Sequence, residues 1–189
     1  MLRPLLVLAL LACGCAPPSS PDADAPASAA PAPRPATMDR STFVEGQPET
    51  EVLRLAEVAA YPAPFSVYLR PGVAYVPPAE GEPVRFVAGE PPFQGEVTVR
   101  AAPGEPPAAV AARERDAVAT SFPIDDAPWA AESFAFVDAD ESGTVHVAQH
   151  DGMVFVVSAR APSEMGDGFA PTLATLLDTW RWADGSALR

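Results

Sequence analysis

The sequence contains no lysine, since all 12 of its basic residues are arginine. A lysine Schiff base and a phosphate-binding P-loop lysine are therefore excluded. Cysteine is almost as rare, because Cys13 and Cys15 are the only two and both lie near the N-terminus. The body of the chain can therefore form no disulfide, thiolate metal site or cysteine nucleophile.

Histidine occurs only as His146 and His150. On one strand the two residues would be about 13 Å apart, at about 3.3 Å per residue, which is too far to chelate one metal ion. No serine stands in the glycine-flanked turn typical of a hydrolase nucleophile. The sequence therefore predicts no catalytic residue, no metal centre and no cofactor.

Positive charge is scarce as well. The formal net charge is −13, from 25 acidic and 12 basic residues. A negative surface repels nucleic acids and bare anionic lipid. We therefore expect no nucleic-acid partner, and we interpret the charge as an aid to solubility.

The first 12 residues have the layout of a secretory signal peptide. Arg3 supplies a positive charge, and an apolar run follows from Leu5 to Ala12. This run is much shorter than the roughly 20 residues that cross a bilayer. We therefore expect an exported protein rather than one with a membrane-spanning helix here.

The segment Leu10-Leu11-Ala12-Cys13 resembles the lipobox of bacterial lipoproteins. The resemblance implies cleavage before Cys13 and attachment of fatty-acyl (palmitate) chains, which hold a protein stably on a membrane when two or more are present. Cys15 is the alternative lipidation site, because small residues precede it too. The predicted location is the cell envelope, lipid-anchored on a periplasmic or extracellular face.

Composition divides the rest of the chain. Residues 13–40 are rich in Ala and Pro, bury almost nothing and are predicted to form a disordered tether. Residues 41–61 form a lead-in of uncertain structure, 62–183 a single α/β domain, and 184–189 a tail.

Local patterns predict the elements of this domain. Alternating or continuous apolar runs predict strands at 65–69, 73–76, 84–87, 96–100, 134–137, 144–148 and 153–159. Helices are predicted at 108–119 and 169–180. Because 153–159 is apolar on both faces, we expect it to be covered on both. Since short connections dominate, the predicted fold class is α+β: a mainly antiparallel, curved sheet flanked by two helices.

This layout resembles the PsbP/Mog1-like superfamily. The resemblance rests on Phe65–Gly72, on the strand pair around Asp151-Gly152 and on the closing segment Leu176–Trp182. It covers roughly residues 62–183. It implies a curved antiparallel sheet flanked by helices, with binding or accessory roles and no catalytic residues.

A calcium-binding loop is a weak alternative at one turn. Asp138, Asp140 and Ser142, followed by Gly143, match the first half of such a loop. Position twelve is Gln149 rather than the usual bidentate glutamate. An acidic turn between two strands explains the same residues, and we prefer it.

Two tryptophans are weak candidates for ligand contact. Trp129 lies in a loop after a proline, and Trp182 lies two residues beyond Trp180, which belongs to the apolar stripe of the last helix. We therefore expect Trp182 to face elsewhere and to be partly exposed. Exposed aromatic residues often anchor binding surfaces, although packing under its loop is the alternative for Trp129.

Together these patterns predict a non-enzymatic binding or accessory module, anchored to a membrane, whose partner is an unknown protein or a small apolar ligand. One alternative is a carrier of an apolar ligand or lipid, which needs a cavity of about 300 Å³ or more between sheet and helix. A hydrolase is the second alternative, and it needs His146 or carboxylates in a cleft.

Replacing Cys13 with serine is expected to abolish lipidation and release the protein from membranes, because the thiol carries the acyl chains. Mass spectrometry of the mature protein from its own host measures the added mass, and Cys15→Ser is the matched control. An unmodified N-terminus in the wild-type protein would contradict the prediction.

Overall fold

A computed structural model describes residues 31–44, 46–59, 61–124, 127 and 129–188. The predicted signal peptide, both cysteines and most of the predicted tether lie outside the described residues. Pro31–Arg189 form one compact unit. Among the described residues, no helix has the length and apolar character needed to cross a bilayer.

The described elements are mostly strands. In chain order they are β1 (Thr37–Val44), β2 (Gln47–Val58), β3 (Phe65–Leu69), β4 (Val73–Val76), β5 (Val84–Ala88), β6 (Gly95–Ala102), α1 (Pro107–Asp116), β7 (Thr120–Pro123), β8 (Glu132–Asp138), β9 (Glu141–His150), β10 (Met153–Pro162), the 3₁₀ helix η1 (Ser163–Gly168), α2 (Ala170–Thr179) and β11 (Arg181–Trp182).

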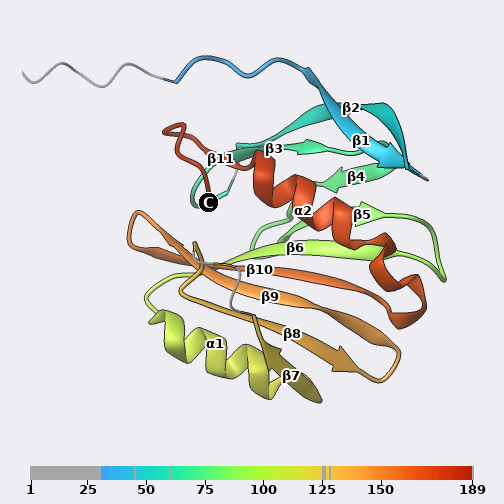
Figure 1. Ribbon diagram of the computed structural model, residues 1–189. Helices are drawn as coiled ribbons and strands as arrows, with labels where there is room; N and C mark the ends of the chain where they lie inside the picture. The colour runs from blue at the N-terminus through green and yellow to red at the C-terminus, as the bar shows by residue number, and fades with distance from the viewer. Residues whose placement is uncertain (1–30, 45, 60, 125–126, 128, 189) are drawn as a thin grey trace, which may run out of the picture. The chain divides into compact units, whose positions relative to one another are not determined.

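The strands form two antiparallel sheets (Figure 1). The smaller sheet has the order β1-β2-β3-β11, and the larger has the order β4-β5-β6-β10-β9-β8-β7. Strands account for 50% of the described residues and helices for 16%. The predicted α+β class is therefore wrong, because the fold is closer to a β-sandwich. The long strand β2 and the short β11, neither of them predicted as a strand, add a second sheet around β3.

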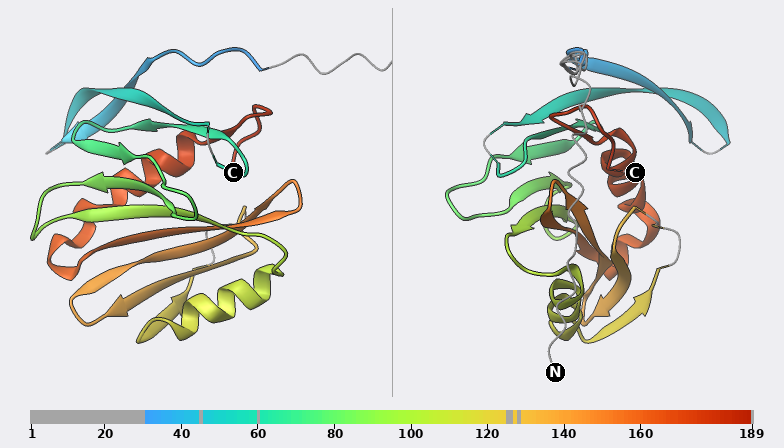
Figure 2. Two further views of the ribbon diagram at one scale, coloured as in Figure 1. Left: turned by 180° about the vertical axis from the view of Figure 1, so that it is seen from behind. Right: turned by 90° about the vertical axis from the view of Figure 1, so that its left-hand side faces the viewer.

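The larger sheet carries a separate apolar core on each face. Phe155 and Val157 of β10 pack in the core shared with the smaller sheet and α2. Val154 and Val156 point the other way and pack with Val110 of α1. The prediction that β10 is covered on both faces is confirmed, and Figure 2 shows α1 and α2 on opposite sides of this sheet.

Stacked aromatic rings join the two sheets. Phe65 of β3 stacks on Trp180, which follows α2, with ring centroids 3.8 Å apart. Trp182 of β11 stacks on His150 of β9 at 4.2 Å and contacts Phe155 of β10 at 4.9 Å. We call these five residues the aromatic junction. It links elements that are far apart in the sequence, so it fixes how the sheets face each other.

Ordered structure begins before the predicted lead-in. β1 starts at Thr37, and the lead-in itself supplies most of the β1–β2 ribbon. Upstream, the Arg34 guanidinium donates hydrogen bonds to the Ser66 carbonyl at 2.9 Å and to the Thr179 carbonyl at 2.7 Å. At the other end, Leu188 is buried.

One glycine is required by close packing between strands. Gly143 lies in β9, and a Cβ atom there would be 1.9 Å from the carbonyl oxygen of Ala159 and 2.8 Å from the Phe136 ring. Real Cβ atoms do not approach so closely, so a side chain would push β9 and β10 apart locally.

We expect Gly143→Ala to lower the free energy of unfolding by about 1–3 kcal/mol, the usual cost of overpacking a well-filled interior. Urea unfolding followed by circular dichroism measures the change. Ser142→Ala, at the neighbouring and partly exposed position, is the control and should change stability much less. Equal losses in the two variants would contradict the packing explanation.

Candidate binding site

Trp182 does not contribute to a binding surface. Its side chain is only 4% exposed, and its ring stacks almost parallel on His150 at 5°. The expectation of partial exposure is wrong, because pairing of β11 with Phe65 of β3 turns Trp182 into the aromatic junction. The helix also ends at Thr179, so helical spacing does not apply beyond it.

The residues considered for calcium form a tight hairpin turn. Asp138 ends β8 and pairs with Glu141, which begins β9, so Ala139 and Asp140 form the turn. Gly143, which suggested the sharp bend of a calcium loop, lies inside β9. The preferred interpretation as an acidic hairpin is confirmed. Within the described residues, no group of three or more His, Cys, Asp or Glu side chains is placed to hold a metal ion.

His146 and Trp129 lie together beside a cavity. His146 is 5% exposed, its Nδ1 atom is 2.9 Å from the Ser133 hydroxyl on the opposite strand, and its ring centroid is 4.9 Å from that of Trp129. The cavity has a volume of about 360 Å³ between β9 and α2. We call it the His146 pocket; its walls include Trp129, Thr144, His146, Leu173, Ala174 and Leu177.

The His146 pocket has polar residues on the side formed by β9 and an apolar wall on the side formed by α2. Ser133 is not among the described residues that line it, and its own exposure is 9%. A serine nucleophile must reach its substrate, whereas this hydroxyl lies behind the imidazole ring. The described geometry therefore favours a hydrogen bond across the two strands over a catalytic pair.

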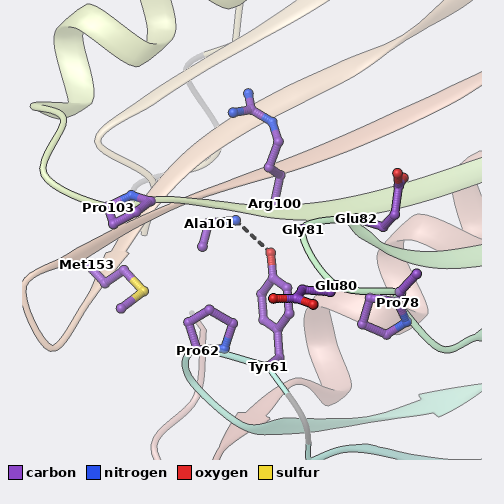
Figure 3. A pocket seen from close by; sticks show the side chains of 11 residues that line it. Tyr61, Pro62, Pro78, Glu80, Gly81, Glu82, Arg100, Ala101, Pro103 and Met153 are labelled. Carbon is purple, nitrogen blue, oxygen red and sulfur yellow. Dashed lines mark hydrogen bonds between the residues drawn. The ribbon is translucent and has the colours of Figure 1, made fainter.

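A wider groove, of about 490 Å³, opens at the other end of the sheet. The β2–β3 and β4–β5 connections form two of its sides, and the end of β6 and the start of β10 form the others (Figure 3). We call it the Tyr61 groove; its walls include Tyr61, Pro62, Pro78, Glu80, Arg100 and Met153.

Tyr61 is fixed by both hydrogen-bonding functions of its hydroxyl. The oxygen accepts a hydrogen bond from the Ala101 N–H at 2.6 Å (Figure 3). The hydroxyl also donates a hydrogen bond to the Val99 carbonyl at 3.0 Å. Strand β5 begins at Val84, opposite Val99, so Ala101 lies beyond the reach of that neighbour. The Tyr61 hydroxyl takes the place of the missing strand, and only the ring remains to form the surface of the groove.

The charges of the groove are separated. The Arg100 side chain points away from Tyr61 (Figure 3). Its guanidinium donates a hydrogen bond to Glu114 of α1 at 2.5 Å, which offsets its charge. Glu80 also lines the groove and is exposed. Glu82 points away from the ring and interacts electrostatically with Arg85. The described charged residues that line the groove are therefore Glu80, Glu82 and Arg100, and the positive charge of Arg100 acts to lower the pKa of Tyr61.

None of the side chains that make this groove was a candidate from the sequence. Tyr61 falls in the lead-in of uncertain structure, and Met153 was assigned only to a covered strand. The available signal was the grouping of Tyr61 and Pro62 between two strands, which resembles any proline-containing loop. Their convergence depends on pairing between distant strands, which no local pattern shows.

No protein-family model matches the chain, and no curated protein matches it either. The resemblances to bacterial lipoproteins and to the PsbP/Mog1-like superfamily therefore stay predictions, and any function has to come from the geometry.

Tyr61→Phe is expected to destabilise the protein by about 1–3 kcal/mol near neutral pH, because the Ala101 N–H loses its partner in a half-buried position. Urea unfolding near neutral pH measures the loss. Tyr75→Phe, which removes no hydrogen bond described for this protein, is the control. A Tyr61→Phe protein as stable as the wild type would contradict the role of the hydroxyl.

The same residue gives a pH dependence. Burial raises the pKa of Tyr61 above its ordinary value of 10.0. The folded state therefore holds the proton more tightly than the unfolded state, so its contribution to stability is complete below about pH 10 and is lost as pH rises through the folded-state pKa. Absorbance at 295 nm follows tyrosine ionisation, and the difference between the wild-type protein and Tyr61→Phe isolates the contribution of Tyr61. A Tyr61 that ionises below pH 10 would contradict this.

Proposed function

We propose that this protein is a non-enzymatic binding module, held at a membrane by acyl chains on its N-terminal cysteine, that takes a small and partly apolar ligand in the Tyr61 groove. The observation that supports the binding site most directly is the groove itself, whose volume of about 490 Å³ falls within the usual range for small-molecule sites. The anchor rests on the lipobox of Cys13 alone.

The walls of the groove are suited to holding a ligand at low entropic cost. Pro62, Pro78 and Pro103 contribute rings without flexible side chains, and Tyr61 is fixed by its two hydrogen bonds. Few rotamers therefore have to be immobilised when a ligand binds. Met153 adds an unbranched, polarisable side chain that adapts to the shape of its neighbour.

The chemistry of the groove favours binding over catalysis. Among the described residues that line it there is no histidine, serine, threonine or cysteine. The Tyr61 hydroxyl is already hydrogen-bonded twice, and its raised pKa keeps it protonated at neutral pH. Arg100 is paired with Glu114. No base is therefore placed beside a nucleophile.

A carrier of an apolar ligand is the second candidate function, and the His146 pocket supports it. This pocket lies between β9 and α2, and its volume of about 360 Å³ exceeds the roughly 300 Å³ expected for such a cavity. Leu173, Ala174 and Leu177 give it an apolar helix wall. The two candidate functions therefore differ in which site binds.

Blocking each site with the same substitution separates them. We would titrate the full chain carrying Cys13→Ser, so that no acyl chain competes, with the neutral fluorescent probe N-phenyl-1-naphthylamine. Ala79→Trp fills the Tyr61 groove, Ala174→Trp fills the His146 pocket, and Ala112→Trp on the exposed face of α1 is the control.

We expect Ala79→Trp to weaken binding about tenfold or more, which corresponds to about 1.4 kcal/mol, and the other two variants to bind like the parent chain. Binding lost only in Ala174→Trp would overturn the proposal in favour of the apolar carrier. A parent chain that binds no probe would overturn both.

A further inference from the structure

We propose that the His146 pocket is a second binding site, separate from the Tyr61 groove, whose ligand is a small neutral molecule with an apolar body and one hydroxyl group. The ligand hydroxyl pairs with the Thr144 side chain, and the apolar body lies against Leu173 and Leu177 of α2. This inference goes beyond the proposed function and does not depend on it. It also differs from an apolar carrier, because one polar group selects the ligand.

The first support is an unsatisfied hydroxyl in the wall of the pocket. Thr144 lines the pocket, and its Oγ1 atom is buried without a hydrogen-bond partner among the described residues. Buried polar groups are nearly always hydrogen-bonded, so this hydroxyl calls for a partner from outside the fold. Rotation about the Cα–Cβ bond exchanges the positions of the hydroxyl and the methyl group. The hydroxyl can therefore turn toward a ligand without giving up an existing hydrogen bond.

The second support is the fixed position of the neighbouring polar side chain. His146 lies two residues beyond Thr144 on β9, so both project from the same face of the sheet. The His146 Nδ1 atom is 2.9 Å from the Ser133 hydroxyl, and its ring packs against Trp129 with centroids 4.9 Å apart. His146 is therefore an ordered wall of the pocket, and the group that calls for a partner is the Thr144 hydroxyl.

The third support is the lack of charge to hold an ion. The described residues that line the pocket include no aspartate, glutamate or arginine. The start of α2 does not supply the missing donors, because Pro171 has no N–H. The N–H groups of Thr172 and Leu173 already donate to the Phe169 carbonyl. A charged ligand would lose its hydration here without compensation, so the geometry favours a neutral one.

An apolar surface leads from the edge of the sheet to the pocket. Thr144 pairs with Ala135 of β8, and Ala135 pairs with Phe122 of β7. Directly opposed residues of antiparallel strands project from the same face, so these three side chains form one row. Phe122 is 52% exposed. Exposed apolar surface beside a pocket suits the apolar body of a ligand that enters from the edge.

Matched probes test the assignment by NMR titration of the full chain with Cys13→Ser, followed at the indole N–H of Trp129, which lines the pocket. Hexan-1-ol, hexanoate and 1-chlorohexane share a six-carbon chain and differ in the end group. We expect hexan-1-ol to bind about tenfold or more tightly than hexanoate, because a carboxylate would be desolvated without a compensating cation. Ala174→Trp should abolish this binding, whereas Ala79→Trp and Ala112→Trp should leave it unchanged.

A single substitution separates the hydroxyl from the shape of the pocket. Thr144→Val replaces the hydroxyl with a methyl group of similar size, and it should weaken hexan-1-ol about fivefold while leaving 1-chlorohexane unchanged. Thr98→Val makes the same exchange on β6 outside the pocket and should bind both probes like the parent chain. Because a buried hydroxyl without a partner costs stability, Thr144→Val should also raise the urea midpoint of the ligand-free protein.

Four results would overturn the inference. They are no shift of the Trp129 signal with hexan-1-ol, loss of that shift in Ala79→Trp rather than Ala174→Trp, a Thr144→Val variant that binds hexan-1-ol as tightly as the parent chain or weakens both probes equally, and a urea midpoint lowered by Thr144→Val. None of them bears on the proposed function, which is tested in the Tyr61 groove with N-phenyl-1-naphthylamine, a probe that carries no hydroxyl group.

Discussion

The stacking contact between Phe65 and Trp180 holds β3, α2 and β11 together. Their rings stack at 3.8 Å with planes at 10°, and Trp180 is only 1% exposed. Large aromatic side chains bury more area than any others, and paired rings add a further stabilisation. Because Phe65 belongs to β3 and Trp180 joins α2 to β11, this contact ties the end of the chain to the smaller sheet. Trp182 contacts His150 and Phe155, and these contacts connect the aromatic junction to the larger sheet.

The groove follows from this junction. The rings of Phe65 and Tyr61 pack in a T-shaped arrangement, and the Tyr61 hydroxyl reaches the part of β6 that β5 does not pair with. The Tyr61 hydroxyl thus completes the hydrogen bonding of β6 beyond the end of β5, and the Tyr61 ring packs against the core. The same placement leaves a fixed aromatic ring in a groove that proline rings also line. This groove is already formed in the structure described.

How much the sequence predicts depends on how local each signal is. β3, β4 and β10 were predicted because their alternation and their turn residues are consecutive. β2 was not, since most of its 12 residues are exposed and its partners are β1 and β3 rather than a buried layer. β7 is exposed at every position, so no alternation of buried and exposed residues marks it as a strand. Gly143 matched a calcium loop, although its real constraint is the Ala159 carbonyl on a paired strand. Tyr61 could not be identified from the sequence, because its hydroxyl has a partner only where β6 extends beyond β5.

The most direct test of this account is the hydrogen exchange rate of the Ala101 amide, measured by NMR on the full chain. If the Tyr61 hydroxyl accepts a hydrogen bond from this amide and the aromatic junction holds the ring in place, the amide should exchange about as slowly as those of the buried β6 core, through global unfolding only. In the Tyr61→Phe variant the Ala101 amide should exchange much faster, while the relative exchange rates of the other β6 amides should stay unchanged. An Ala101 amide that exchanges in the wild-type protein as fast as an exposed loop amide would contradict the account, because the groove would then have no fixed wall.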